Sequence, residues 1–93
     1  MTKQFRLVMI KWVDSRQPTS SWQWLSKHEG TPVSCTTVGW LIKDSDEAMS
    51  ICQSFGDIDA SDGDIQTMGV TLIPTRAIID IVDLHESVKE AAE

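Results

Sequence analysis

The stretch Ile73-Pro74-Thr75-Arg76-Ala77-Ile78-Ile79 decides the predicted fold. Pro74 interrupts one segment rich in β-forming residues, and a second such segment begins at Ile78. The short interval between the two segments is the length of a single 3₁₀ turn. The stretch therefore predicts a strand, a 3₁₀ corner and a last strand, a connection that helps to close a small β-barrel.

The segments around this corner also have the composition of strands, because β-branched and aromatic residues alternate in part with polar ones. We expect strands over residues 5–13, 33–42, 48–55, 68–73 and 78–84. Residues 48–55 also suit a helix, but their alternation and the flanking strands favour a strand. The sequence thus predicts a mainly β protein with one short helix, built as a small five-stranded barrel of the Sm-like type.

The short helix is expected after the first strand. Ser20 and Gln23 form a capping-box pattern at its start, and Gly30 is suited to its end. A helix of two turns is not stable alone, so it must pack on the sheet. Trp22 and Leu25 share one helical face, and we expect that face to make the contact.

Length and charge limit the kinds of partner. The chain has 93 residues with 8 Lys and Arg against 14 Asp and Glu, which gives a net charge of −6. We expect one domain over residues 1–84 and a polar tail over residues 85–93. A domain of this size has a thin core, so we expect a homo-oligomer. The acidic balance disfavours nucleic acid as a partner, and no apolar run is long enough to cross a membrane.

The reactive residues predict neither a metal site nor an enzyme. Cys35 and Cys52 lack the spacing of a zinc site, and we expect both thiols to be reduced in the cytoplasm. The acidic loop over residues 57–64 lacks the spacing of a calcium-binding loop, so we interpret it as a solvated loop. His28 and His85 have no matching nucleophile, and no phosphate-binding glycine loop is present. We therefore expect no catalytic residues and no cofactor.

Tryptophan is concentrated in one part of the chain, since all four Trp residues lie between Trp12 and Trp40 and Tyr is absent. The first Trp opens a polar turn. An indole can stack on a base, and a guanidinium can bind a phosphate through two hydrogen bonds. We predict Trp24 at an interface. We predict a ligand-binding site made of Trp12, Asp14, Ser15, Arg16, Trp40, Thr75 and Arg76.

A purely structural interpretation of the same residues remains open. In this interpretation Asp14 and Ser15 are ordinary turn residues, and Trp12 covers the barrel. Trp40 follows Gly39, a residue that lets another backbone or a ligand approach closely, and Trp40 suits the core as well as ligand stacking.

Four motifs occur in a fixed order: Trp-x-Asp-Ser at residues 12–15, Trp-x-x-Leu at 22–25, Val-Gly-Trp-Leu at 38–41 and Ile-Pro-Thr-Arg at 73–76. Together they resemble a group of small accessory proteins of phages and prophages, over most of the chain. The resemblance implies a phage protein that acts in the cytoplasm of a bacterial host. Small phage proteins of this kind often antagonise host defence, and some do so as oligomers that sequester nucleotide second messengers.

Three hypotheses follow for the function. The leading one is a non-enzymatic, phage-encoded oligomer that antagonises bacterial defence by sequestering a nucleotide-type signalling molecule. The alternative is a protein–protein inhibitor that presents its acidic surface and Trp24 to a host defence enzyme, as a mimic of nucleic acid. The third is an Sm-like nucleic-acid binder, which the net charge of −6 disfavours.

Overall fold

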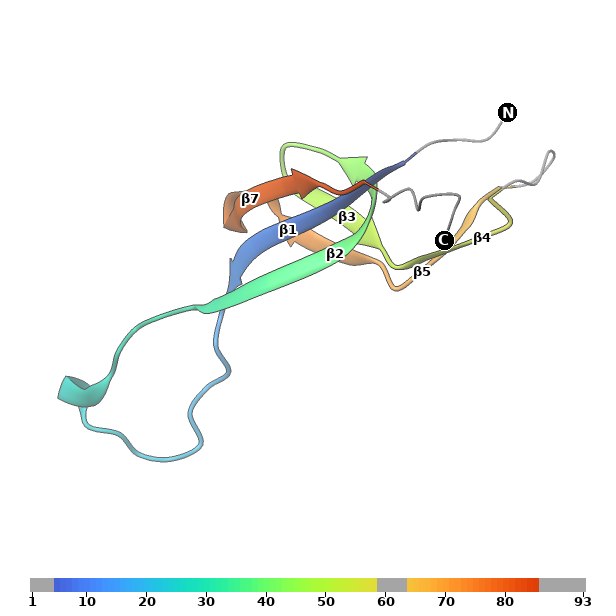
Figure 1. Cartoon of the computed structure of the whole chain (residues 1–93). Helices are drawn as coiled ribbons and strands as arrows, with labels where there is room; N and C mark the ends of the chain where they lie inside the picture. The colour runs from blue at the N-terminus through green and yellow to red at the C-terminus, as the bar shows by residue number, and fades with distance from the viewer. Residues whose placement is uncertain (1–4, 59–63, 86–93) are drawn as a thin grey trace, which may run out of the picture.

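The structure is a computed structural model that describes residues 5–58 and 64–85. Within these residues the chain forms short and long β-strands and two single-turn 3₁₀ helices (Figure 1). In chain order they are β1 (Arg6–Asp14), η1 (Leu25–Lys27), β2 (Val33–Asp44), β3 (Ala48–Cys52), β4 (Ser54–Gly56), β5 (Gln66–Met68), β6 (Thr71–Pro74), η2 (Thr75–Ala77) and β7 (Ile78–Asp83). The mainly β prediction is therefore confirmed.

One antiparallel sheet forms the body of the molecule, with the strand order β6-β3-β2-β1-β7. A second, two-stranded sheet of β4 and β5 extends the β3–β6 pair into one long hairpin. The hairpin stays joined at the break, because the backbone N–H of Gln53 donates to the carbonyl of Met68 at 3.1 Å. Gly69 has a φ of 72° at this break, a conformation that favours glycine. The strand predicted over residues 68–73 is therefore interrupted.

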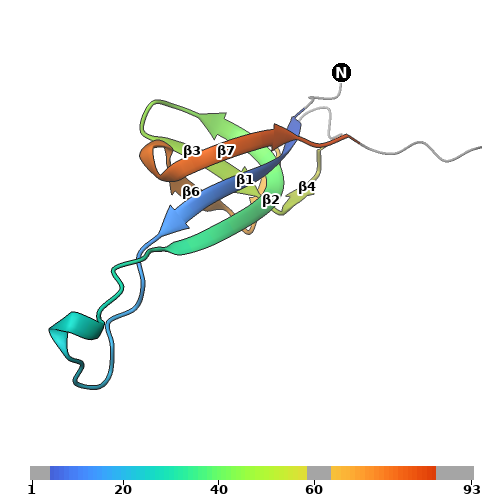
Figure 2. The same ribbon diagram turned by 60° about the vertical axis from the view of Figure 1, so that its left-hand side comes forward.

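The core lies inside the curve of the five-stranded sheet (Figure 2). Val8 and Ile10 of β1 pack in one fully buried cluster with Ile51 of β3 and Ile73 of β6. Two other strands separate β1 from β6 in the sheet, so this contact requires strong curvature. We call the opposite side of β7, β1 and β2 the outer face.

The corner predicted from the sequence is present. The 3₁₀ turn η2 joins β6 to β7, which are the two edges of the sheet. Its backbone is tied to the β2–β3 turn, since the N–H of Thr75 donates to the carbonyl of Glu47 at 2.9 Å. The prediction of a closed barrel is wrong for the described residues, because β6 and β7 do not pair with each other. A turn of three residues brings the edges to the same end of the sheet without aligning them for a ladder.

Gly39 allows the closest approach within the sheet. A Cβ at this position would lie 2.5 Å from the Cγ2 atom of Ile51 and 2.7 Å from the carbonyl oxygen of Cys52. Real Cβ atoms do not come so near to other heavy atoms, so only glycine fits. The sequence analysis expected a close neighbour at Gly39, and that neighbour is the backbone of β3.

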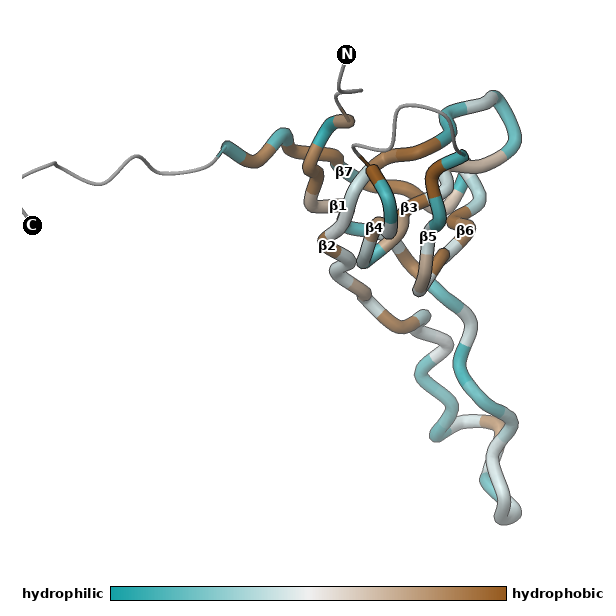
Figure 3. The backbone as a smooth tube through the Cα atoms, turned by 90° about the vertical axis from the view of Figure 1, so that its right-hand side faces the viewer, coloured by the Kyte–Doolittle hydropathy of each residue, from teal (hydrophilic) through white to brown (hydrophobic). Residues whose placement is uncertain are grey.

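Residues 15–32, which we call the arm, extend away from the sheet between β1 and β2 (Figures 1–3). The helix predicted from Ser20 is wrong, because the only helical structure in the arm is the single turn η1 and Trp24 has an extended backbone. Trp22 and Leu25, which were predicted to pack on the sheet, are exposed. A helix of two turns needs a tertiary partner, and the described residues offer the arm none.

The arm makes the molecule longer than a compact domain. The radius of gyration is 18.5 Å, against about 13 Å for a compact domain of roughly 100 residues. The strands predicted over residues 5–13, 33–42 and 78–84 are confirmed, whereas the strand predicted over residues 48–55 is β-structure that breaks at Gln53 into β3 and β4. Most of the tail predicted over residues 85–93 and the centre of the acidic loop lie outside the described residues.

No helix in the described ranges is long and apolar enough to span a membrane.

Candidate functional site

The structure brings most of the predicted ligand-binding residues to one end of the sheet, where the arm begins (Figure 1). Trp12 pairs with Ile78, the residue that directly follows η2. The turn after β1 therefore lies at the same end as Thr75 and Arg76. Trp40 is the exception, because it pairs with Leu7 at the other end of β1.

Trp12 belongs to the core side of the sheet. It is half-buried and packs against the buried cluster. Its indole N–H donates a hydrogen bond to the hydroxyl oxygen of Thr37 on β2 at 3.0 Å. A buried indole N–H needs such a partner, so this residue serves the fold.

The polar side chains nearby shape turns. The backbone N–H of Ser15 donates to the Oδ1 atom of Asp14 at 2.7 Å. The hydroxyl of Thr75 donates to the carbonyl of Ser45 at 3.1 Å. The bond at Asp14 lies within a turn, which is the structural interpretation that the sequence had left open for Asp14 and Ser15. The bond of Thr75 instead joins η2 to the β2–β3 turn. Arg76 is exposed on η2 and makes no ion pair among the described residues.

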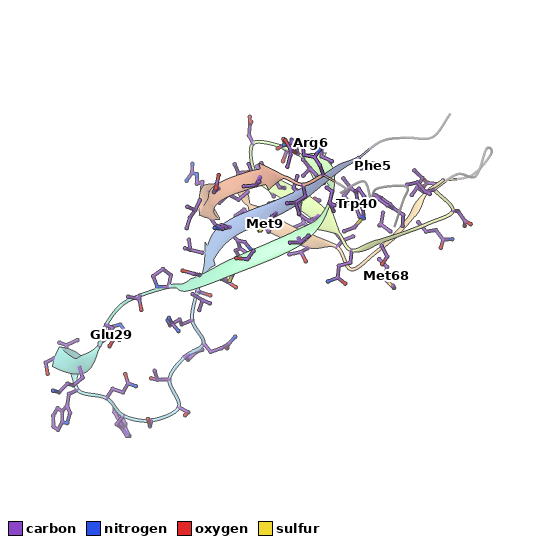
Figure 4. The ribbon with its side chains drawn as sticks, in the orientation of Figure 1. Phe5, Arg6, Met9, Glu29, Trp40 and Met68 are labelled. Atoms are coloured by element: carbon purple, nitrogen blue, oxygen red, sulfur yellow. The ribbon has the colours of Figure 1, made fainter. Side chains whose placement is uncertain are left out.

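Trp40 lies on the outer face, away from the other predicted residues. Its ring centroid is 5.9 Å from that of Phe55, which in turn lies 4.8 Å from that of Phe5. Tilted aromatic pairs at these distances are stabilising contacts. In Figure 4, Phe5 and Trp40 lie at one end of the molecule and Glu29 of the arm lies at the other. Trp12 and Trp40 therefore do not form one stacking site.

Arg16 holds the base of the arm together. Its Nε–H donates to the carbonyl of Thr31 at 2.6 Å, and its Nη2 group donates to the carbonyl of Pro32 at 3.4 Å. These bonds join the two ends of the arm and engage two of the five guanidinium N–H groups. The other N–H groups stay available for an anion.

The arm encloses an open hollow of about 820 Å³. Arg16 lines it together with Lys27 and His28, so three side chains that can donate to an anion face the same space. Glu29 brings one carboxylate to the same wall. The remaining lining residues are Gln17, Pro18, Thr19, Gln23, Gly30, Thr31 and Pro32.

Sequence reasoning identified Arg16 but missed Lys27 and His28. Counting the charged residues separately in the arm and in the rest of the chain would have indicated these two residues. The arm holds two basic residues and one acidic residue, a net charge of +1. The rest of the chain holds six basic and thirteen acidic residues, a net charge of −7. An anion therefore meets its least repulsive surface at the arm.

The two cysteine thiols and the Arg6–Asp83 ion pair make contacts that serve the fold. Cys35 and Cys52 are free thiols, and burial raises the pKa of the Cys52 thiol, which keeps it protonated at neutral pH. Arg6 donates to Asp83 at 2.8 Å, and this hydrogen bond lowers the pKa of the Asp83 carboxyl. No group of His, Cys, Asp and Glu residues in the described ranges could hold a metal ion.

Comparisons of the chain with protein-family models, with curated proteins and with solved structures find no match. The features that bear on function are therefore the residues of the arm and of the outer face. Two of these features stand out: the cationic hollow around Arg16, and the exposed apolar side chains farther along the arm.

Proposed function

We propose that the protein is a non-enzymatic binding protein that sequesters an anionic, nucleotide-type molecule in the hollow of the arm. The observation that carries this proposal is that Arg16, Lys27 and His28 converge on one hollow in a chain whose net charge is −6. The two cations, Arg16 and Lys27, create a local site for an anion that the rest of the acidic surface repels.

The hollow also has groups suited to a base. The side-chain amides of Gln17 and Gln23 line it, and each amide both donates and accepts hydrogen bonds. The imidazole of His28 offers a ring face for stacking, as does the guanidinium plane of Arg16. Phosphate would be held by Arg16 and Lys27, because an arginine fork makes two directional bonds and a lysine adds a point charge.

The biological setting of this proposal comes from the sequence pattern, which resembles phage accessory proteins. In the cytoplasm of a bacterial host, binding without turnover would remove a nucleotide signal and so antagonise a defence response. A nucleotide-binding protein of this kind acts by abundance and affinity, so it needs no catalytic group.

Isothermal titration calorimetry with the purified full chain tests the proposal. The panel contains cyclic dinucleotides, cyclic trinucleotides and ADP-ribose derivatives. Arg16→Ala and Lys27→Ala should each lower the affinity about ten- to a hundred-fold, the effect of losing one charge-assisted hydrogen bond. Lys43→Ala is the matched control, since Lys43 is an exposed cation on β2 outside the hollow.

Arg76→Ala separates two versions of the site. If the ligand reaches from the hollow to η2, the Arg76 variant also binds more weakly. If the hollow alone holds the ligand, Arg76→Ala behaves like the Lys43 control. Equal affinity of wild type and Arg16→Ala would remove the hollow as the binding site.

A second candidate function is inhibition of a host protein, and it is favoured by one observation, the exposure of Trp24 on an otherwise acidic molecule. Exposed Trp is enriched among the residues that dominate protein interfaces. If no member of the nucleotide panel binds wild type, this candidate takes the place of nucleotide sequestration.

A further inference from the structure

The tip of the arm presents large apolar side chains to solvent. The exposed fractions are 102% for Trp22, 78% for Trp24 and 90% for Leu25. None of these three lines the hollow, so the proposed ligand site does not use them. Apolar groups gathered on a projecting segment indicate a surface made for contact with another molecule.

A second apolar surface lies on the outer face of the sheet. Val82, Met9 and Val38 are direct neighbours across β7, β1 and β2. Leu7 and Trp40 form the next pair along the strands. We call these five residues the apolar patch. Val38 is 51% exposed and Val82 is 38% exposed, whereas Leu7, Met9 and Trp40 are half-buried and Trp40 packs against Phe55. The patch is therefore open to solvent mainly at Val38 and Val82.

Polar residues border the apolar patch on the side that faces the arm. Asp80, Lys11 and Thr36 are exposed neighbours across the same three strands, one step nearer the end where the arm begins. An apolar patch with a polar border is typical of a protein–protein interface.

The arm does not reach the apolar patch of its own chain. It leaves the sheet at the end opposite Trp40 and projects away from the strands (Figures 1 and 4). Each chain therefore carries both apolar surfaces, and among the described residues the two do not contact each other. In a pair of copies, the tip of the arm of one copy can contact the apolar patch of the other.

Charge also favours a second copy. The arm has a net charge of +1 and the rest of the chain has a net charge of −7. The arm therefore has a charge opposite to that of the body of another copy, although the border of the apolar patch itself holds one carboxylate, Asp80, beside one cation, Lys11. Complementary charge of this kind steers association and selects the partner.

We propose that the arm of each copy lays Trp22, Trp24 and Leu25 on the apolar patch of a second copy. A reciprocal exchange of this kind forms a closed dimer with twofold symmetry. Two Trp side chains bury about 300–500 Å², and the patch loses a similar area. Two such contacts remove roughly 1,200–2,000 Å² from solvent, which is the size of a standard stable interface.

Sedimentation velocity and native mass spectrometry of the full chain test the dimer at micromolar concentration. Wild type should have twice the chain mass of 10.4 kDa. The double variant Trp22→Ser/Trp24→Ser and the patch variant Val38→Lys should both have the monomer mass and keep the far-ultraviolet circular dichroism of the wild type. Leu72→Lys is the matched control, because Leu72 is an exposed apolar residue of β6 outside the patch, and it should remain a dimer.

A cross-linking experiment locates the contact. A photoreactive benzoylphenylalanine at position 24 should form cross-links to peptides of β1, β2 or β7 that belong to a second, isotope-labelled copy. A monomeric wild type, a dimeric Val38→Lys variant, or cross-links confined to other strands would each overturn the exchange. The inference does not depend on a ligand, so the calorimetry and the dimer experiment can fail separately.

Discussion

The indole N–H of Trp12 on β1 donates to the hydroxyl oxygen of Thr37 on β2, at 3.0 Å. The two residues are not directly opposite in the ladder, because Trp12 faces Cys35 and Thr37 faces Ile10. The bond therefore runs diagonally on the core side of the sheet. It explains how an indole with a polar N–H can be half-buried at the end of a small core.

Removal of the acceptor should destabilise the protein. Thr37→Val keeps the side-chain shape but leaves the Trp12 N–H without a partner, which costs about 1–3 kcal/mol of unfolding free energy. Urea unfolding followed by tryptophan fluorescence measures the loss. Thr36→Val is the control, since Thr36 is exposed on the outer face. Equal midpoints for both variants would show that water satisfies the indole instead.

Gly39 should tolerate no side chain. In Gly39→Ala the new methyl group meets the carbonyl oxygen of Cys52, a backbone atom that cannot rotate away. We expect a loss of about 1–3 kcal/mol or more, the usual cost of overpacking a core. Gly56→Ala is the matched control in another strand, because its Cβ would lie 3.4 Å from the nearest atom, in ordinary contact. Denaturant midpoints compare the two, and equal losses would contradict the close approach of β2 and β3.

The ion pair of Arg6 and Asp83 should make a small, pH-dependent contribution to stability. The hydrogen bond from Arg6 lowers the pKa of Asp83 in the folded protein below its value in the unfolded chain, about 3.9. The contribution is therefore present at neutral pH and is lost as the pH falls through the folded pKa.

Unfolding midpoints of wild type and Asp83→Asn, measured from neutral to strongly acidic pH, check this dependence. The difference between them should be largest above about pH 4 and vanish in acid, and salt should reduce it because both side chains are half exposed. Asp46→Asn in the β2–β3 turn is the control, since Asp46 is exposed and makes no ion pair among the described residues. A difference that persists in acid would assign the effect to packing.

The strands could be predicted because their signals are local. The 3₁₀ corner at residues 75–77 followed from Pro74 and the β-branched residues after it, and the structure has it. The alternation over residues 48–55 favoured a strand over a helix, and the segment is β-structure, although it is divided into β3 and β4. Each of these outcomes depends on neighbours within a few residues, which a sequence shows directly.

The arm could not be predicted in the same way. Ser20, Gln23 and Gly30 are good helix-boundary residues, yet a helix of two turns forms only when it packs on another element. The route of β1 and β2 sends residues 15–32 away from the sheet, so that element is missing. The capping residues therefore lie in a segment with a single helical turn, Leu25–Lys27.

By itself, the sequence determined the strands, the corner before β7 and the acidic balance of the chain, because composition and short-range alternation encode them. Only the tertiary structure decided which Trp residues are free to make contacts. Trp12 is held on the core side by Thr37, and Trp40 packs with Phe55, whereas Trp22 and Trp24 are exposed. The physical reason is that exposure depends on which strands pair and on where the chain leaves the sheet, and these are long-range relations that no local pattern contains.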